Sequence, residues 1–189
     1  PTKIYFFILQ QIYMMKKLKN KDLKRINIAE FKRAKKTPIT IVLDNVRSAL
    51  NVGSIFRTAD AFLIEKIILC GITTTPPNKE IRKVALGSTD SVNWEFEEST
   101  LNTVSKLKKK GYYMMAVEQA EGSTKLNSCT LTKQPIAIIM GHEINGVSQD
   151  VINICDEVIE IPQFGTKHSL NISVATGIVI WELWKQINT

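Results

Sequence analysis

Short apolar runs alternate with segments of helical periodicity along most of this chain. The apolar runs predict strands over residues 39–43, 66–70, 112–117, 136–140 and 158–161. Apolar residues at helical spacing, with capping or turn residues beside them, predict helices over residues 51–63, 101–110 and 170–187. Because parallel strands need crossover connections, this alternation predicts an α/β fold with a mostly parallel sheet and helices on both faces.

Polar residues or glycines follow the predicted strands in three segments, which are residues 51–62, 136–148 and 161–175. In open parallel sheets, ligands bind outside the carboxyl ends of the strands. We therefore expect the three segments to lie along the ligand-binding edge of the sheet. The sequence lacks the G-x-G-x-x-G fingerprint after its first strand, which disfavours a conventional dinucleotide-binding fold.

The third segment, which begins IPQFGTKHSLN, joins a strand end, a loop and a helix start. A loop that leads into a helix offers free backbone N–H groups to a ligand. Either Ser169 or Asn171 is expected to cap the helix. The apolar residues at helical spacing in this region should face the core, and they are Leu170, Val174, Ile178 and Trp181. Taken alone, the segment favours an ordinary capped connection between a strand and a helix.

The three segments, in this order and at these separations, resemble the motifs of the SpoU (TrmH) family of RNA ribose 2'-O-methyltransferases, within the SPOUT class. The resemblance covers about residues 38–187, and three ordered motifs are far more specific than one. It implies a SPOUT fold with a C-terminal deep trefoil knot, which periodicity cannot show. It divides the chain into a basic N-terminal arm, residues 1–37, and a SPOUT methyltransferase catalytic domain, residues 38–189.

The resemblance also implies a reaction, the transfer of a methyl group from S-adenosylmethionine to a ribose 2'-hydroxyl in structured RNA, either tRNA or rRNA. Holding the donor and the hydroxyl in line supplies much of the barrier reduction in such a displacement. The residues that match the catalytic positions of the family are Arg57, Asn51, Ser169, Asn171 and Glu143. Loop residues whose backbone groups would hold the methyl donor are Gly141, Ile161, Gln163 and Leu170.

Arg57 matches the proposed catalytic centre of the family, with Asn51 orienting it. Because a guanidinium stays protonated in proteins, Arg57 is a poor general base. Our hypothesis is that it binds the phosphate beside the target ribose and that this phosphate accepts the 2'-proton. Without the resemblance, Arg57 would be interpreted as a structural ion pair, Asn51 as a helix N-cap and Glu143 as a solvated carboxylate.

Charge favours a polyanionic partner. The net charge is +7, from 25 Lys and Arg against 18 Asp and Glu, although a basic balance alone also suits a membrane surface. The basic residues gather in the arm, between residues 14 and 36. The side chains expected to contact RNA are Lys16, Lys17, Lys19, Lys24, Arg25, Arg33 and Lys167, of which the last could instead contact only solvent.

The first residues and the cysteines indicate in which cellular compartment the protein is expected. One hypothesis is that residues 1–13 extend upstream of the true start, because two methionines follow them. Their apolar patch is too short to span a bilayer, so no membrane partner is expected. Cys70, Cys129 and Cys155 show no metal spacing and an odd count, which predicts reduced thiols in the cytoplasm. Cys70, at the end of an apolar run, is expected to be buried.

No metal site is expected, since His142 and His168 are lone histidines without carboxylate or cysteine partners. A homodimer is expected from the resemblance, with the helices of the third motif packed together. Trp181 and Trp184 suit that interface or an intramolecular core equally. One rival function is a non-catalytic RNA-binding protein on the same scaffold, and another is a small-molecule α/β enzyme that uses a different nucleotide.

Overall fold

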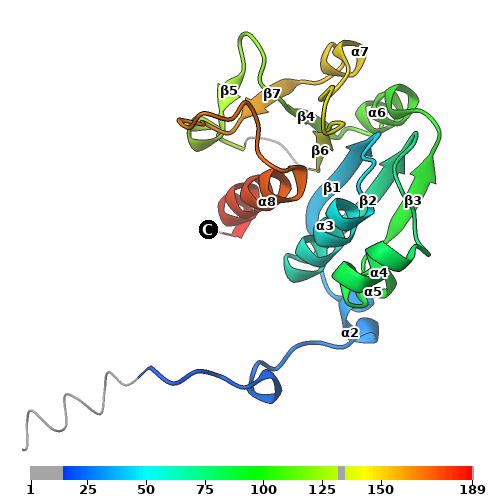
Figure 1. The fold of residues 1–189 in the computed structure, drawn as a ribbon, viewed down its shortest axis with the longest axis vertical. Coiled ribbons are helices and arrows are strands. Elements are labelled where there is room, and N and C mark those ends of the chain that lie inside the picture. Colours follow the sequence, from blue (N-terminus) through cyan, green and yellow to red (C-terminus); the bar gives the residue numbers. More distant parts are fainter. Residues whose placement is uncertain (1–14, 132–134, 189) are drawn as a thin grey trace, which may run out of the picture.

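The computed structural model describes residues 15–131 and 135–188 of the chain. Within these ranges, parallel strands form one seven-stranded sheet in the order β3-β2-β1-β6-β4-β7-β5 (Figure 1). The strands are β1 (Thr37–Asp44), β2 (Ile64–Cys70), β3 (Trp94–Glu97), β4 (Tyr113–Val117), β5 (Thr124–Lys125), β6 (Ile136–Met140) and β7 (Glu157–Glu160). The predicted strands are thus confirmed, with shifts of one or two residues at several ends.

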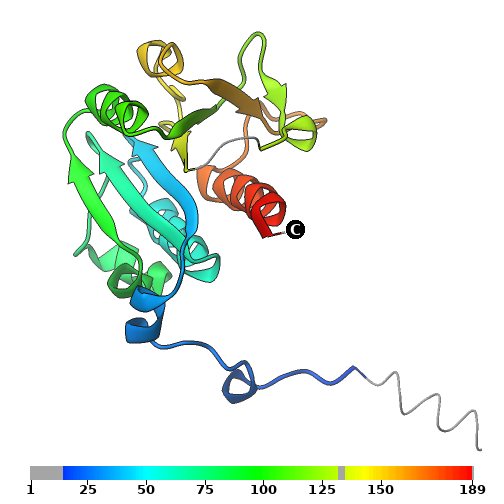
Figure 2. The same ribbon diagram turned by 180° about the vertical axis from the view of Figure 1, so that it is seen from behind.

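Helices cover both faces of this sheet (Figures 1 and 2). One face carries α3 (Ala49–Ala61), α4 (Lys79–Ala85), α5 (Ser88–Ser91) and α8 (Ile172–Asn188). The other face carries α6 (Thr100–Lys109) and α7 (Gln149–Ile152). Short 3-10 helices, η1 (Asn20–Asp22) and η2 (Leu126–Ser128), and the helix α2 (Ile28–Arg33) complete the described elements.

The strand β6 shows why the sheet needs both layers. Every residue of β6 is buried, and successive side chains point to opposite faces of a strand. Ile136, Ile138 and Met140 pack with α3 and α8, whereas Ala137 and Ile139 pack with α6 and α7. A continuous apolar run of this kind is typical of a parallel sheet covered on both sides, so the predicted α/β fold is confirmed.

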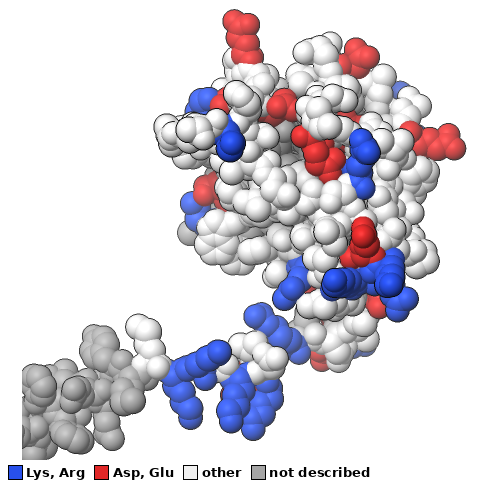
Figure 3. All heavy atoms as spheres, viewed as in Figure 1, with Lys and Arg blue, Asp and Glu red and all other residues white. Residues whose placement is uncertain are grey.

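The segment predicted as an N-terminal arm contains two parts. Residues 15–26 run away from the domain, and their Lys and Arg side chains crowd along this extension (Figure 3). The helix α2 instead packs on the domain, because Phe31 is only 3% exposed and belongs to the core. Asn27 and Glu30 form a capping box at its start. The hypothesis on residues 1–13 lies outside the described residues.

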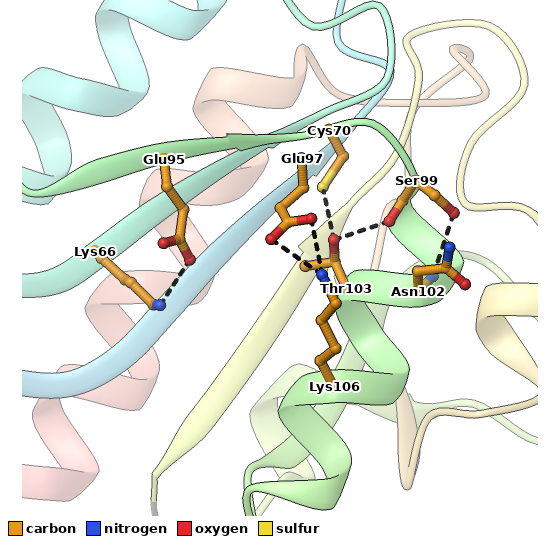
Figure 4. Close-up of polar contacts among 8 residues, drawn as sticks. All are labelled: Lys66, Cys70, Glu95, Glu97, Ser99, Asn102, Thr103 and Lys106. Atoms are coloured by element: carbon orange, nitrogen blue, oxygen red, sulfur yellow. Dashed lines mark hydrogen bonds and ion pairs between the residues drawn. The ribbon is translucent and has the colours of Figure 1, made fainter.

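The edge strand β3 is absent from the elements that the sequence predicts, because charged residues interrupt its apolar positions. Glu95 and Glu97 point towards the α6 side and form ion pairs with Lys66 (2.8 Å) and Lys106 (3.1 Å) (Figure 4). Exposed pairs of this kind contribute little stability. They do place charge along the β3 edge of the sheet, where an uncharged edge strand could pair with another chain.

The orientation of α8 contradicts the prediction. Val174 and Trp181, which were expected in the core, are 51% and 52% exposed, and Leu170 and Ile178 are also exposed. The buried face of α8 is made by Ile172, Thr176, Val179, Ile180 and Leu183. Apolar residues surround most of this helix, so spacing alone could not identify the face that meets the sheet. The result is an apolar stripe at the surface of the protomer.

None of the helices in residues 15–131 and 135–188 has the length and apolar character that crossing a bilayer requires. The deep trefoil knot stays a prediction.

Candidate functional site

A cavity of about 550 Å³ lies at the carboxyl ends of the central strands β4, β6 and β7. Three stretches of chain line it, namely residues 117–119 after β4, residues 141–146 after β6 and the chain from Glu160 to Ala175 between β7 and α8. This is the edge where ligands bind in open parallel sheets. The second and third predicted segments therefore meet there.

All of the residues predicted to hold a methyl donor line this one cavity, namely Gly141, Ile161, Gln163 and Leu170. Three of the predicted catalytic residues line it too, namely Glu143, Ser169 and Asn171. Asn51, Arg57 and Lys167 do not belong to the lining. The geometry thus separates a donor cavity from the residues on α3.

Glu143 ties the loop after β6 to the start of α3. Its carboxylate accepts hydrogen bonds from the backbone N–H groups of Ser48 (3.0 Å) and Arg47 (3.2 Å) and from the side chain of Asn51 (3.3 Å). Glu143 is exposed, as a solvated carboxylate would be, but these three donors also hold it in place. The N-cap of α3 is Ser48, whose hydroxyl accepts from the Asn51 N–H, so the interpretation of Asn51 as an N-cap is wrong.

These contacts keep Glu143 ionised. Burial raises its pKa, but the hydrogen bonds from its own N–H, from Ser48 and Arg47 and from Asn51 outweigh burial and leave the pKa below its ordinary value. The carboxylate is thus a fixed negative acceptor at neutral pH. The surrounding donors hold this charge in place, and the charge in turn fixes the position of Asn51.

Asn171 connects the third motif to the first. Its side-chain amide donates to Oδ1 of Asn51 (3.1 Å), while its own Oδ1 accepts from the backbone N–H (2.9 Å) and hydroxyl (2.7 Å) of Ser173. Asn171 is therefore the capping residue of α8, which confirms one of the two alternatives. Ser169 lines the cavity, and within the described residues its side chain makes no hydrogen bond.

Arg57 lies exposed on α3. Among residues 15–131 and 135–188, no side chain forms an ion pair or hydrogen bond with its guanidinium. The interpretation as a structural ion pair is therefore wrong. A guanidinium left free at the surface of the helix that carries Asn51 is available to bind an anion.

His142 has a structural role in its loop. Its Nδ1 accepts hydrogen bonds from the backbone N–H groups of Ile144 (3.0 Å) and Asn145 (3.3 Å). His142 and Gly146 also exchange two backbone hydrogen bonds (3.0 and 2.9 Å). Because this Nδ1 atom already accepts hydrogen bonds from the backbone, it does not serve as a general base. His168 lines the cavity through the other loop.

Sequence reasoning missed three polar residues of the lining, which are Glu118, Gln119 and Glu160. Glu118 and Gln119 come directly after the apolar run of β4, so the strand-end rule that found the other segments would have found them too. Glu160 accepts a hydrogen bond from Ser123 (2.7 Å) and pairs with Lys125 (2.6 Å), contacts that no local pattern reveals.

The cysteines take no part in this cavity. Cys70 and Cys129 are buried, as predicted for Cys70, and Cys155 is half-buried. Burial raises the pKa of each thiol to about 11, so the thiolate forms are scarce at neutral pH. Among the residues that the structure describes, no group of three His, Cys, Asp or Glu side chains could hold a metal ion.

Residues 38–181 match the family model of the SpoU rRNA Methylase family. The chain belongs to this family. It is similar to the SpoU relative named 23S rRNA (guanosine-2'-O-)-methyltransferase RlmB of Blochmanniella floridana, with 33% identity over 149 residues, 79% of this chain and 58% of that protein. It is 33% identical over 170 residues to the tRNA (guanosine(18)-2'-O)-methyltransferase of Aquifex aeolicus, which covers 88% of this chain and 77% of that protein.

Solved structures of SpoU relatives share the fold. The AdoMet-bound rRNA methyltransferase from Sinorhizobium meliloti superposes with a TM-score of 0.76 at 29% identity, over 82% of this chain and 59% of that one. The A. aeolicus TrmH/SpoU tRNA modifying enzyme superposes with a TM-score of 0.75 at 28% identity, over 84% and 80%. The predicted SPOUT fold is confirmed, and the chain spans 58% of the RlmB relative.

Proposed function

We propose that this SpoU protein transfers a methyl group from S-adenosylmethionine to a ribose 2'-hydroxyl in RNA. The observation that carries the proposal is the hydrogen-bonded series Glu143, Asn51 and Asn171, which joins three distant segments beside one cavity. The relatives support the same chemistry, since they include proteins named as 2'-O-methyltransferases of rRNA and of tRNA. RNA is the substrate because only RNA carries the 2'-hydroxyl.

The cavity fits the methyl donor. Its volume of about 550 Å³ is ordinary for a site that holds a molecule of this size. A Cβ atom at Gly141 would lie 2.1 Å from the backbone carbon of Gly146, so only glycine allows this close turn. Backbone groups at Gly141, Ile161, Gln163 and Leu170 would hold the donor. When bound, S-adenosylmethionine supplies an electrophilic methyl group on its sulfonium.

Arg57 would bind the phosphate next to the target ribose. Its guanidinium is exposed and free of partners within the described residues, and its planar fork suits a phosphate. That phosphate would accept the proton of the 2'-hydroxyl while the ribose oxygen bonds to the methyl carbon, the carbon–sulfur bond of the donor breaks and S-adenosylhomocysteine leaves. Asn51, held between Glu143 and Asn171, would orient Arg57 on the same helix.

The extended arm would capture the RNA. The side chains of Lys16, Lys17, Lys19, Lys24, Arg25, Arg33 and Lys167 form no ion pair within the described residues, and those of the arm lie along an exposed extension (Figure 3). Unpaired cations of this kind release counterions when they meet phosphates, which supplies affinity without sequence readout.

We propose that two copies pair through the apolar stripe of α8. Leu170, Val174, Ile178 and Trp181 are exposed in the protomer, together with Leu50 on α3. Trp181 stacks on Trp184 at 5.5 Å, and Phe62 meets both rings edge-on. Apolar stripes of this kind mark interfaces. We also place the protein in the cytoplasm, where unpaired thiols and RNA substrates occur together.

Mapping of ribose methylation in total RNA, from cells with and without the gene, tests this function. Deletion should remove 2'-O-methylation at a specific site, and a complementing Arg57→Ala variant should not restore it, whereas the wild-type gene should. The site that disappears would name the substrate, rRNA or tRNA. If no site changes although the purified protein binds RNA, the non-catalytic RNA-binding function replaces the proposed one.

A further inference from the structure

Two polar residues directly after β4 lie between the two loops that form the cavity. Glu118 is half-buried and Gln119 is exposed, and both line the cavity. The backbone N–H of Glu118 donates to the carbonyl of Ile159 on β7 (3.1 Å). Because β4 and β7 are neighbours in the sheet, Glu118 starts from a position that the sheet itself fixes.

The Glu118 carboxylate holds the loop after β6. One oxygen accepts a hydrogen bond from the backbone N–H of Val147 (2.9 Å), and the other accepts from the backbone N–H of Gln119 (2.8 Å). Val147 is buried in the core on the α6 side. Both oxygens are thus engaged with backbone donors, an arrangement that needs an acceptor on each side of the carboxyl group.

Gly146 shows how closely this carboxylate approaches the loop. A Cβ atom at Gly146 would lie 2.0 Å from Oε2 of Glu118, and Gly146 has a φ of +65°, in the left-handed region. The left-handed backbone therefore favours glycine, and a side chain at this position would also displace the Glu118 carboxylate. The loop packs directly on the Glu118 side chain without an intervening layer.

Gln119 reaches the other loop. Its side-chain amide donates a hydrogen bond to the backbone carbonyl of His168 (2.6 Å), in the segment that continues through Ser169 and Leu170 to α8. Consecutive residues at one strand end thus bind both loops of the cavity, one as an acceptor and one as a donor. The link is chemically asymmetric, because Glu118 must accept and Gln119 must donate.

We propose that Glu118 and Gln119 are positioning residues that fix both loops in the geometry that binds the methyl donor. The inference rests on the proposed function, since it concerns the same cavity. Neither residue belongs to the three motifs or contacts Asn51 or Arg57. They act by keeping the backbone groups of the loops in place before the donor arrives, which reduces the ordering cost of binding.

Two isosteric exchanges test the proposal. In Glu118→Gln, one carboxylate oxygen becomes an NH2 group that faces a backbone N–H. In Gln119→Glu, a carboxylate oxygen faces the carbonyl of His168. The matched control is Glu121→Gln, an exposed position two residues further along that is outside the cavity lining. Gln119 lies at the surface, so Gln119→Glu is expected to fold even if Glu118→Gln yields little protein.

Calorimetric titration with S-adenosylmethionine should show about tenfold weaker binding for each variant, the change that corresponds to one hydrogen bond of this kind, and no change for the control. At saturating donor, the single-turnover rate should return to within about threefold of the wild type, because the residues on α3 are unaltered. Equal donor affinity in both variants and wild type would overturn the proposal.

Hydrogen exchange on the protein without donor separates this proposal from the function itself. Amides in residues 141–147 should exchange faster in Glu118→Gln, and amides in residues 163–170 faster in Gln119→Glu. If the wild type neither binds the donor nor methylates RNA, the proposed function fails, yet the exchange data still decide whether the two side chains hold the loops. Unchanged exchange in both variants refutes the positioning role.

Discussion

The side-chain amide of Asn171 donates a hydrogen bond to Oδ1 of Asn51 at 3.1 Å, although 120 residues separate them along the chain. Asn51 in turn donates a hydrogen bond from its own side-chain amide to Glu143 (3.3 Å). Each amide therefore has one defined orientation, because its acceptor oxygen and its donor nitrogen face different neighbours. From this series of hydrogen bonds, the direction in which several substitutions change stability can be predicted.

Asn51→Asp should destabilise the protein, because it places a second carboxylate beside Glu143. We expect a loss of about 1 kcal/mol at pH 7, which shrinks in acid as the carboxylates become protonated. Urea unfolding at both pH values measures it. Asn102→Asp, in the first turn of α6, is the control and should be neutral or slightly stabilising. An Asn51→Asp protein as stable as the wild type at pH 7 would contradict the network.

Glu143→Gln should make the free energy of unfolding depend less steeply on pH in the acid range. The pKa of Glu143 in the folded protein lies below its ordinary value of 4.5, so the unfolded state binds more protons in this range. Its contribution is therefore present above about pH 4.5 and is lost as the pH falls through the folded pKa. Denaturant titrations from pH 6 to pH 3 should show the difference, with Glu121→Gln as the control that keeps the wild-type slope.

Arg57→Lys should reduce the single-turnover rate of methyl transfer by about 100-fold, because an ammonium cannot reproduce a bidentate contact with phosphate. Stability should stay within about 0.5 kcal/mol of the wild type, since the side chain is exposed. Arg82→Lys, on the exposed side of α4, should retain full activity. A near wild-type rate for Arg57→Lys would rule out the phosphate role.

Neutralising five cations of the arm should weaken RNA binding in a salt-dependent way. With Lys16, Lys17, Lys19, Lys24 and Arg25 changed to Ala, the magnitude of the slope of log K against log salt should fall by up to about 3.5 to 4.5. Affinity for S-adenosylmethionine should not change. Filter binding over a range of salt concentrations measures the slope. Lys109→Ala with Lys110→Ala, on the far side of the sheet, is the control, and an equal effect there would deny the arm a special role.

Trp181→Glu should convert the proposed dimer into monomers, because it places a charge on the apolar stripe of α8. Sedimentation velocity reports the change directly. Trp94→Glu introduces the same charge at an exposed aromatic residue of β3 and should leave the dimer intact. Wild-type protein that sediments as a monomer at micromolar concentration would exclude this interface.

Apolar runs were sufficient to predict five of the seven strands that the structure describes, together with the ligand edge of the sheet. The run from Ile136 to Met140 is buried on both faces, and that condition appears directly as unbroken hydrophobicity. The family resemblance then supplied the residues predicted to hold the donor, all of which line the cavity. These features depend on local sequence or on a sheet edge that every strand shares.

The predictions that the structure contradicts failed for a different physical reason. The spacing of Val174 and Trp181 is helical, but a helix that is apolar on most sides has no unique inner face until its neighbours are known. Asn51 looked like a cap, whereas Ser48, three residues earlier, holds that position. Contacts such as Asn171 with Asn51 depend on which strand ends become neighbours, and no local pattern carries that information.

The long sequence separations inside the site have a consequence for synthesis. Glu143 contacts Asn51 across 92 residues, and Asn171 reaches it across 120. A nascent chain that has emerged from the ribosome only as far as β6 contains α3, but it lacks Glu143, Asn171 and the cavity wall that follows β7. The protein therefore cannot bind a methyl donor until α8 has been translated, however early the first strands fold.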